Sequence, residues 1–278
     1  MICLMAGTKK TDPFVINWKG KIGYGDIISP ISYVLNLADK NSTNAILRFH
    51  WPYNSPQKYK PEDTETLQDR IDITWNYINS SKVTIEHIYN SKLDYNHNDY
   101  DETNFECHNL RISDTPYLNA EGGRFLNSNI VMVTSMEHKE TWDEYGRHKA
   151  WKDPLAGTWP KACEQINNRN WDLDFVHYSD KMENVIQLMK NCRGVIGYHG
   201  AHMWIARMLG LPMIIFSKKS LTDKAFPWCI RFENWTTFSP DSIEEYFQQS
   251  IQKREEVKKK YEQYLTEPNI HRLRGKRT

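Results

Sequence analysis

Residues 199–202 could bind a phosphate group. They include two histidines and a glycine, and they lie between a stretch typical of a strand and a stretch typical of a helix. Residues 194–197 are small and apolar, which predicts a buried strand, and residues 202–209 repeat apolar side chains at helical spacing. The apolar residues 213–216 predict a further strand. A strand that turns directly into a helix aims backbone N–H groups and the positive end of the helix at one point, which suits a diphosphate.

The residues of this turn that we expect to contact a ligand are His199, Gly200, Ala201 and His202. Gly200 would let the ligand approach the backbone closely, since glycine has no side chain. The two histidines could bond phosphate or sugar oxygens in either charge state, because histidine titrates near physiological pH. The alternative is an ordinary strand-helix-strand crossover in which the histidines only cap the helix.

A second glycine-rich turn follows the first apolar stretch of the chain. Residues 14–18 predict a strand, and residues 27–38 repeat apolar side chains at helical spacing. The turn between them contains Gly23, Tyr24, Gly25 and Asp26. Asp26 could act chemically or could simply cap the helix that follows.

Cations for a bound phosphate group could come from the loops after the predicted strands 130–133 and 213–216. Open α/β sheets bind their ligands at the carboxyl ends of the strands, so these loops are well placed. The basic residues in them are Lys139, Arg147, Lys149, Lys218 and Lys219. The polar residues Ser135, Glu137 and Asp180 also follow strands. Each of these side chains could instead be an ordinary exposed residue.

The remaining pattern predicts an α/β protein with two Rossmann-like domains. Strands over 45–49, 83–88 and 173–178 alternate with helices over 64–79, 159–168 and 182–191, which favours parallel sheets. Residues 89–129 are rich in Asn, Asp and Tyr without periodicity, so a boundary falls there. We expect an N-terminal domain over 1–126, a C-terminal domain over 127–265 that ends in a charged helix packed across both domains, and a basic tail over 266–278.

Composition excludes several classes of protein. Lys and Arg number 36 against 35 Asp and Glu, so no strong overall field draws the chain to nucleic acid or membranes. The sequence has neither a membrane-spanning apolar run nor a signal peptide pattern, which predicts a cytoplasmic protein.

The 5 cysteines are scattered and are expected to be reduced. The Asp-x-Asp pairs at 99–101 and 172–174 are too common a pattern to indicate a metal site, and we predict no metal and no cofactor.

Both turns resemble segments of glycosyltransferases with the GT-B fold. Residues 195–216, VIGYHGAHMWIARMLGLPMIIF, resemble the donor-binding segment of the heptosyltransferase-like group, which ends in an A-x-x-L-G-x-P pattern. They also resemble the pentosyl- and N-acetylglucosaminyl-transferases that carry an H-G-A turn after a similar strand. Gly25-Asp26-Ile27-Ile28 resembles the G-D-I/V-I start of the heptosyltransferase-like N-terminal domain. Pro30 lies closer to Asp26 here than the corresponding proline does in that group, and the turn at His202 is spaced differently from Pro212.

The resemblance implies that the protein transfers a sugar from a nucleotide-diphosphate sugar, expected to be UDP-linked, to an acceptor hydroxyl. Asp26 matches the aspartate that acts as catalytic base in the heptosyltransferase-like group. The turn at His199 to His202, with Arg147, Lys149 and Lys218, would then bind the donor diphosphate.

Three interpretations of the function stay open, two of which differ in the acceptor. A phage-like composition and the basic end of the chain favour a hydroxymethylated base in DNA. A bacterial surface glycan fits the same motifs. A nucleotide- or nucleic-acid-binding module without catalysis would also retain the turn.

Overall fold

The structure, a computed structural model, describes residues 13–18, 31, 34–35, 38–39, 41–58, 63–78, 82–90, 100–102, 128, 130–134, 165–166, 169, 171–176, 180–198, 200–217, 225–233 and 237–266. Its strands are β1 (Phe14–Trp18), β2 (Ala45–Trp51), β3 (Val83–Tyr89), β4 (Tyr100–Glu102), β5 (Ile130–Thr134), β6 (Asp172–Val176), β7 (Gly194–Tyr198), β8 (Met213–Phe216) and β9 (Ile230–Phe232). Its helices are α2 (Leu67–Ile78), α6 (Met182–Asn191), α7 (Ala201–Met208), α9 (Ile243–Thr266) and the short 3-10 helix η4 (Pro240–Ser242).

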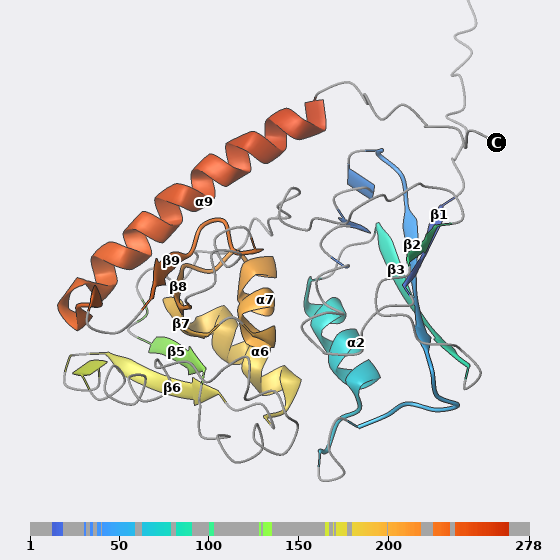
Figure 1. The fold of residues 1–278 in the computed structure, drawn as a ribbon, viewed down its shortest axis with the longest axis horizontal. Coiled ribbons are helices and arrows are strands. Elements are labelled where there is room, and N and C mark those ends of the chain that lie inside the picture. Colours follow the sequence, from blue (N-terminus) through green and yellow to red (C-terminus); the bar gives the residue numbers. More distant parts are fainter. Residues whose placement is uncertain are drawn as a thin grey trace, which may run out of the picture.

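The strands form two sheets. The first has the order β3-β2-β1-β4, with β1, β2 and β3 parallel and β4 antiparallel to β1. The second has the order β6-β5-β7-β8-β9 and is parallel throughout. The predicted α/β class with parallel sheets is therefore confirmed, and the helices α2, α6 and α7 lie between the two sheets (Figure 1).

Right-handed crossovers explain which helix covers which face of the second sheet. The connections from β6 to β7 and from β7 to β8 run in the same direction along the sheet. Because right-handed crossovers that run in the same direction place their helices on the same face, α6 and α7 lie together on one face. The connection from β5 to β6 moves the opposite way, and its buried Ile166 accordingly packs on the other face with α9. The sheet is thus covered on both sides.

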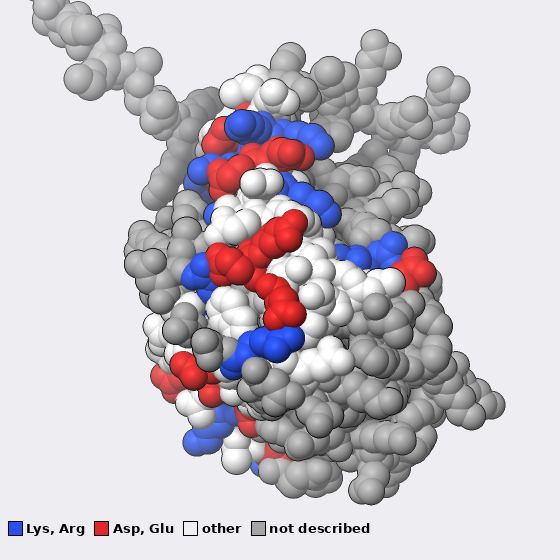
Figure 2. Space-filling view, turned by 90° about the vertical axis from the view of Figure 1, so that its left-hand side faces the viewer, with Lys and Arg blue, Asp and Glu red and all other residues white. Residues whose placement is uncertain are grey.

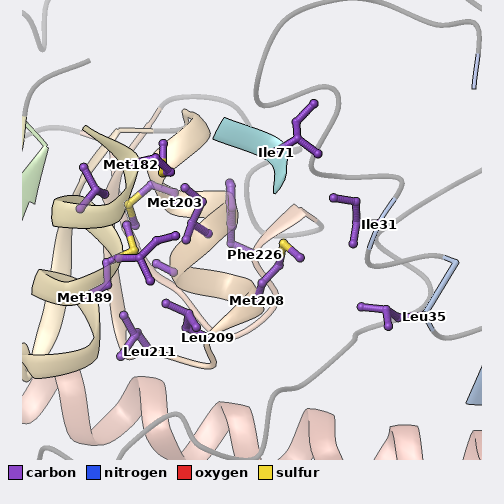
Figure 3. Close-up of a cluster of buried hydrophobic side chains, with 14 of the residues drawn as sticks. Ile31, Leu35, Ile71, Met182, Met189, Met203, Met208, Leu209, Leu211 and Phe226 are labelled. Carbon is purple, nitrogen blue, oxygen red and sulfur yellow. The ribbon is translucent and has the colours of Figure 1, made fainter. Parts of the chain in front are cut away.

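Alternation along the strands divides the core into two clusters. In β8, Met213 and Ile215 join the cluster between the sheets, while Ile214 and Phe216 face α9. The first cluster contains residues of both sheets together with buried side chains of α2, α6 and α7, several of which are drawn in Figure 3. Each sheet is built from one side of the predicted boundary near residue 126, although the division into two separate domains stays a prediction.

Helix α9 joins both halves of the chain. Its residues Ile243 and Phe247 pack on the second sheet, and the Tyr261 hydroxyl donates a 3.0 Å hydrogen bond to Asp39 Oδ2 near the first. The predicted charged helix is thus present, and its last residue is Thr266. Within the described residues, no helix combines the length and the apolar character that a membrane span requires.

Candidate functional site

The order of the second sheet marks one position as its ligand-binding edge. Numbered from β5, the order is 2-1-3-4-5, the doubly wound arrangement in which the strand order reverses between the first and third strands. Open α/β sheets bind ligands at the carboxyl ends of the strands that flank this reversal. Here these ends are Thr134 of β5 and Tyr198 of β7. The turn at residues 199–202 follows Tyr198, so the sheet order and the sequence motif indicate the same place.

Helix α7 begins at this turn without a side-chain cap. Gly200 is exposed and is the N-cap residue, and as a glycine it makes no side-chain cap hydrogen bond. Its carbonyl accepts hydrogen bonds from Met203 N (3.1 Å) and Trp204 N (3.3 Å), which start the helix. Since the first amides of a helix have no intrahelical acceptor, an anion at this position would meet backbone donors and the positive helix end.

The start of α6 is different, because a carboxylate already occupies it. The amide of Met182 donates to both Glu65 oxygens, at 3.2 Å to Oε1 and 3.0 Å to Oε2. A phosphate group could bind the Met182 amide only by displacing this carboxylate. Of the two described helices α6 and α7, α7 is therefore the better anion site.

The structure describes part of the predicted donor turn. Ala201 and His202 lie in the first turn of α7 and are both half-buried, next to the exposed Gly200. The other predicted donor and acceptor residues lie outside the described residues: His199, Arg147, Lys149, Lys218, Lys139, Lys219, Ser135, Glu137, Gly23, Tyr24, Gly25 and Asp26. Asp180 is half-buried and lies two residues before α6.

The first sheet has a polar pair near the carboxyl ends of β1 and β2. His50 Nε2 and Asn17 Oδ1 lie 2.8 Å apart, and Asn17 is buried. The residues that follow β1 lead directly into the predicted turn ending at Asp26. Sequence reasoning missed this pair because the predicted strand over 45–49 ended before His50. A polar residue near the carboxyl end of each of two adjacent parallel strands was the available signal.

A second histidine of the first sheet is unsuited to acid-base chemistry. Trp51 Nε1 donates to His87 Nδ1 at 3.0 Å, so the His87 proton lies on Nε2, which donates to Asp72 Oδ1 at 3.0 Å. Both ring nitrogens are thereby used in structural bonds. Burial raises the pKa of the nearby Tyr89 hydroxyl, with smaller contributions from Asp72 and Asp69, so Tyr89 is protonated at neutral pH.

The buried cation of α7 lies at the opposite end of the helix from the turn. Arg207 is in the last turn, is 1% exposed, and places its guanidinium carbon 5.2 Å from the centre of the Trp204 ring. Burial lowers the pKa of Arg207 to about 10, which leaves it charged at neutral pH. A cation in the last turn interacts favourably with the negative end of the helix. Its role is therefore structural.

The described residues contain no group of three or more His, Cys, Asp or Glu side chains that could hold a metal ion. Asp172 and Asp174, one of the Asp-x-Asp pairs, are both exposed and are the first and third residues of β6. Cys192 and Cys229 are buried free thiols, as predicted for these two cysteines.

A scan of the chain against protein-family models gives no match. A search of curated protein sequences likewise finds none that matches it.

Proposed function

We propose that this protein is a glycosyltransferase that uses a nucleotide-diphosphate sugar, expected to be UDP-linked, as its donor. The observation that carries the proposal is the coincidence of two independent features at one edge. The strand-order reversal of the second sheet lies between β5 and β7, and the start of α7 at its N-cap Gly200 follows β7 directly.

The chemistry assigned to this edge is the stabilisation of the leaving diphosphate. Its charge develops as the bond between the sugar carbon and the phosphate oxygen breaks, and preorganised backbone donors stabilise such charge without reorganising. The amides that begin α7 and the side chain of His202 would supply these donors.

On the acceptor side, we assign Asp26 as the general base. Its carboxylate takes the proton of the acceptor hydroxyl while the hydroxyl oxygen attacks the sugar carbon. Supporting this assignment, the chain enters the glycine-rich turn from the carboxyl end of β1, the strand that neighbours both β2 and β4.

The test measures nucleotide diphosphate released from a panel of nucleotide sugars, after a thermal-shift screen has selected the donors that bind. Binding raises the unfolding temperature by mass action. We expect at least one UDP-sugar to stabilise the protein, and Asp26→Asn to lower turnover at least about 100-fold with donor binding unchanged. Asp172→Asn is the matched control, since Asp172 is an exposed aspartate at the amino end of an edge strand.

Three results would decide against parts of this proposal. Stabilisation by none of the nucleotide sugars would remove the donor assignment. Stabilisation without diphosphate release, with DNA and glycan acceptors present, would leave a binding module without catalysis. Full activity of Asp26→Asn would remove Asp26 as the base.

For the acceptor we propose a hydroxymethylated base in DNA, with a bacterial surface glycan as the alternative outcome. The face of the molecule on which α9 begins carries interspersed acidic and basic side chains rather than a basic area (Figure 2). The candidates for binding DNA are the basic residues Arg272, Arg274, Lys276 and Arg277. Duplex binding that weakens steeply with salt supports the DNA acceptor. No binding at low salt favours the glycan.

A further inference from the structure

Glu65 connects the two halves of the molecule in a way that its position in the sequence does not suggest. It lies two residues before α2, yet its carboxylate accepts the first amide of α6, which is 117 residues further along the chain. Lys181, the N-cap residue of α6, makes no side-chain cap of its own. The cap of α6 is therefore supplied by the other half of the chain.

The surroundings of Glu65 hold its carboxylate in this position. Arg70 of α2 is 2% exposed, and its Nε lies 3.5 Å from Glu65 Oε2. The α2 helix itself is fixed by a reciprocal cap, in which Thr66 N donates to Asp69 Oδ2 (2.9 Å) and Asp69 N to Thr66 Oγ1 (3.0 Å). Glu65 is thus anchored on α2 while it binds α6.

This contact brings the carboxyl edges of the two sheets together. Helices in parallel α/β units run antiparallel to their strands, so α2 and α6 both begin at the carboxyl edge of their own sheet. Because Glu65 joins these two beginnings, the proposed donor edge and the proposed acceptor edge adjoin there. The residues Asp180 and Lys181, which lead from β6 into α6, are held by the same contact.

We propose that Glu65 is a positioning residue for the donor site: from the acceptor-side half, it fixes the start of α6 and the preceding residues 180–181 beside the nucleotide-binding edge. This inference rests on the proposed function. Loss of the carboxylate leaves the buried Arg70 without this charge partner and the Met182 amide without its acceptor. The start of α6 then frays, and donor binding weakens while the rest of the second sheet stays folded.

The experiment compares Glu65→Ala, Glu65→Gln and Tyr77→Phe. The glutamine keeps a carbonyl oxygen for the Met182 amide but removes the charge. Tyr77 is the matched control, since it joins the same two helices: its hydroxyl donates to Glu183 Oε1 (3.2 Å) and accepts from Gln187 Nε2 (2.8 Å). Affinities for UDP, GDP, ADP, CDP and dTDP are measured by titration calorimetry, and amide hydrogen exchange is followed over residues 182–191.

For the best-bound nucleoside diphosphate, we expect Glu65→Ala to raise Kd about tenfold, within the usual range of coupling between sites. Glu65→Gln should raise it about threefold or less, and Tyr77→Phe should leave it unchanged. Hydrogen exchange should accelerate over residues 182–186 in Glu65→Ala and stay unchanged in α9. A merely structural contact would instead lower the unfolding temperature of Glu65→Ala and Tyr77→Phe without separating their affinities.

The inference is wrong if Glu65→Ala binds the diphosphate within twofold of the wild type, or if Tyr77→Phe weakens binding equally. Should Glu65→Ala fail to fold, Glu65→Gln decides by the same comparison with Tyr77→Phe. If the wild type binds none of the five diphosphates, both the proposed function and the donor-site role of Glu65 are refuted. The effect of Glu65 on the start of α6 is then tested by hydrogen exchange alone. Unchanged exchange over residues 182–186 in Glu65→Ala would refute that effect as well.

Discussion

The hydroxyl of Ser250 joins α9 to the second sheet, and its removal should be among the more damaging small substitutions in the protein. Ser250 is fully buried. Its Oγ accepts from Met213 N at 3.0 Å and donates to the Trp228 carbonyl oxygen at 2.7 Å. The Trp228 ring in turn donates from Nε1 to the Leu211 carbonyl oxygen at 2.9 Å. One hydroxyl thus satisfies two buried backbone groups from two segments.

Ser250→Ala removes one oxygen atom and leaves both backbone groups buried. A buried polar group without a partner costs about 1–3 kcal/mol, so the two together cost roughly 2–6 kcal/mol, less any relaxation. We take about 3 kcal/mol as the expected loss in the free energy of unfolding. For a chain of this size, that corresponds to a fall of about 5 °C in the unfolding temperature.

The assay is urea unfolding followed by circular dichroism, with calorimetry for the unfolding temperature. Thr266→Ala is the control, since the Thr266 hydroxyl donates to the Gln263 carbonyl oxygen (2.8 Å) at an exposed site. Its effect should stay within about 0.5 kcal/mol. A loss below about 1 kcal/mol for Ser250→Ala, or equal losses for the two variants, would refute the reasoning from buried hydrogen bonds.

Three further predictions concern β7 and its surroundings. Gly194→Ala would place a Cβ 2.5 Å from ring atoms of the buried Phe247, so we expect a loss of about 1–3 kcal/mol in urea unfolding, partly relieved in a double variant with Phe247→Leu. The hydrogen bond from Arg193 lowers the pKa of Glu244, so this pair stabilises the fold above the unfolded pKa of about 4.3. That stability should disappear as the pH falls through the lower folded pKa, and the difference between wild type and Glu244→Gln in urea unfolding should vanish there. Burial raises the pKa of Cys192 to about 12, so peptide mapping after thiol labelling at pH 8 should find Cys192 unmodified in native protein and modified in urea.

The sequence predicted β7 and β8 of the second sheet well because their residues 194–197 and 213–216 are all buried. The predicted helix over 182–191 and the strand over 213–216 have the same ends as α6 and β8. A continuous apolar strand beside an amphipathic helix is a strong local signal. The short strand β9 lacks such a signal. Its three residues, Ile230 to Phe232, were not predicted, since their pairing with β8 is what makes them a strand.

The contacts that organise the candidate site could not be predicted from local patterns. Glu65 and Met182 are 117 residues apart, and Asn17 and His50 are 33 apart. Neither pair lies in a motif, because the partners meet only after the parallel strands have paired and the helices have packed. The sheet order has the same origin, and it supplies the argument for the ligand-binding edge that the sequence lacked.

The segment that resembles glycosyltransferases, residues 195–216, has two parts, and the structure explains each part differently. Gly210 has a φ of 67°, a conformation that glycine adopts readily, and the Leu211 and Gly210 amides bond back to Ala206 O and Arg207 O at 3.0 Å each. These bonds form the Schellman motif that ends many helices. The A-x-x-L-G-L-P part of the resemblance is therefore explained by helix termination, whichever ligand the protein binds. The other part, the turn at Gly200, is the one that bears on function, because α7 begins there, at the reversal of the strand order.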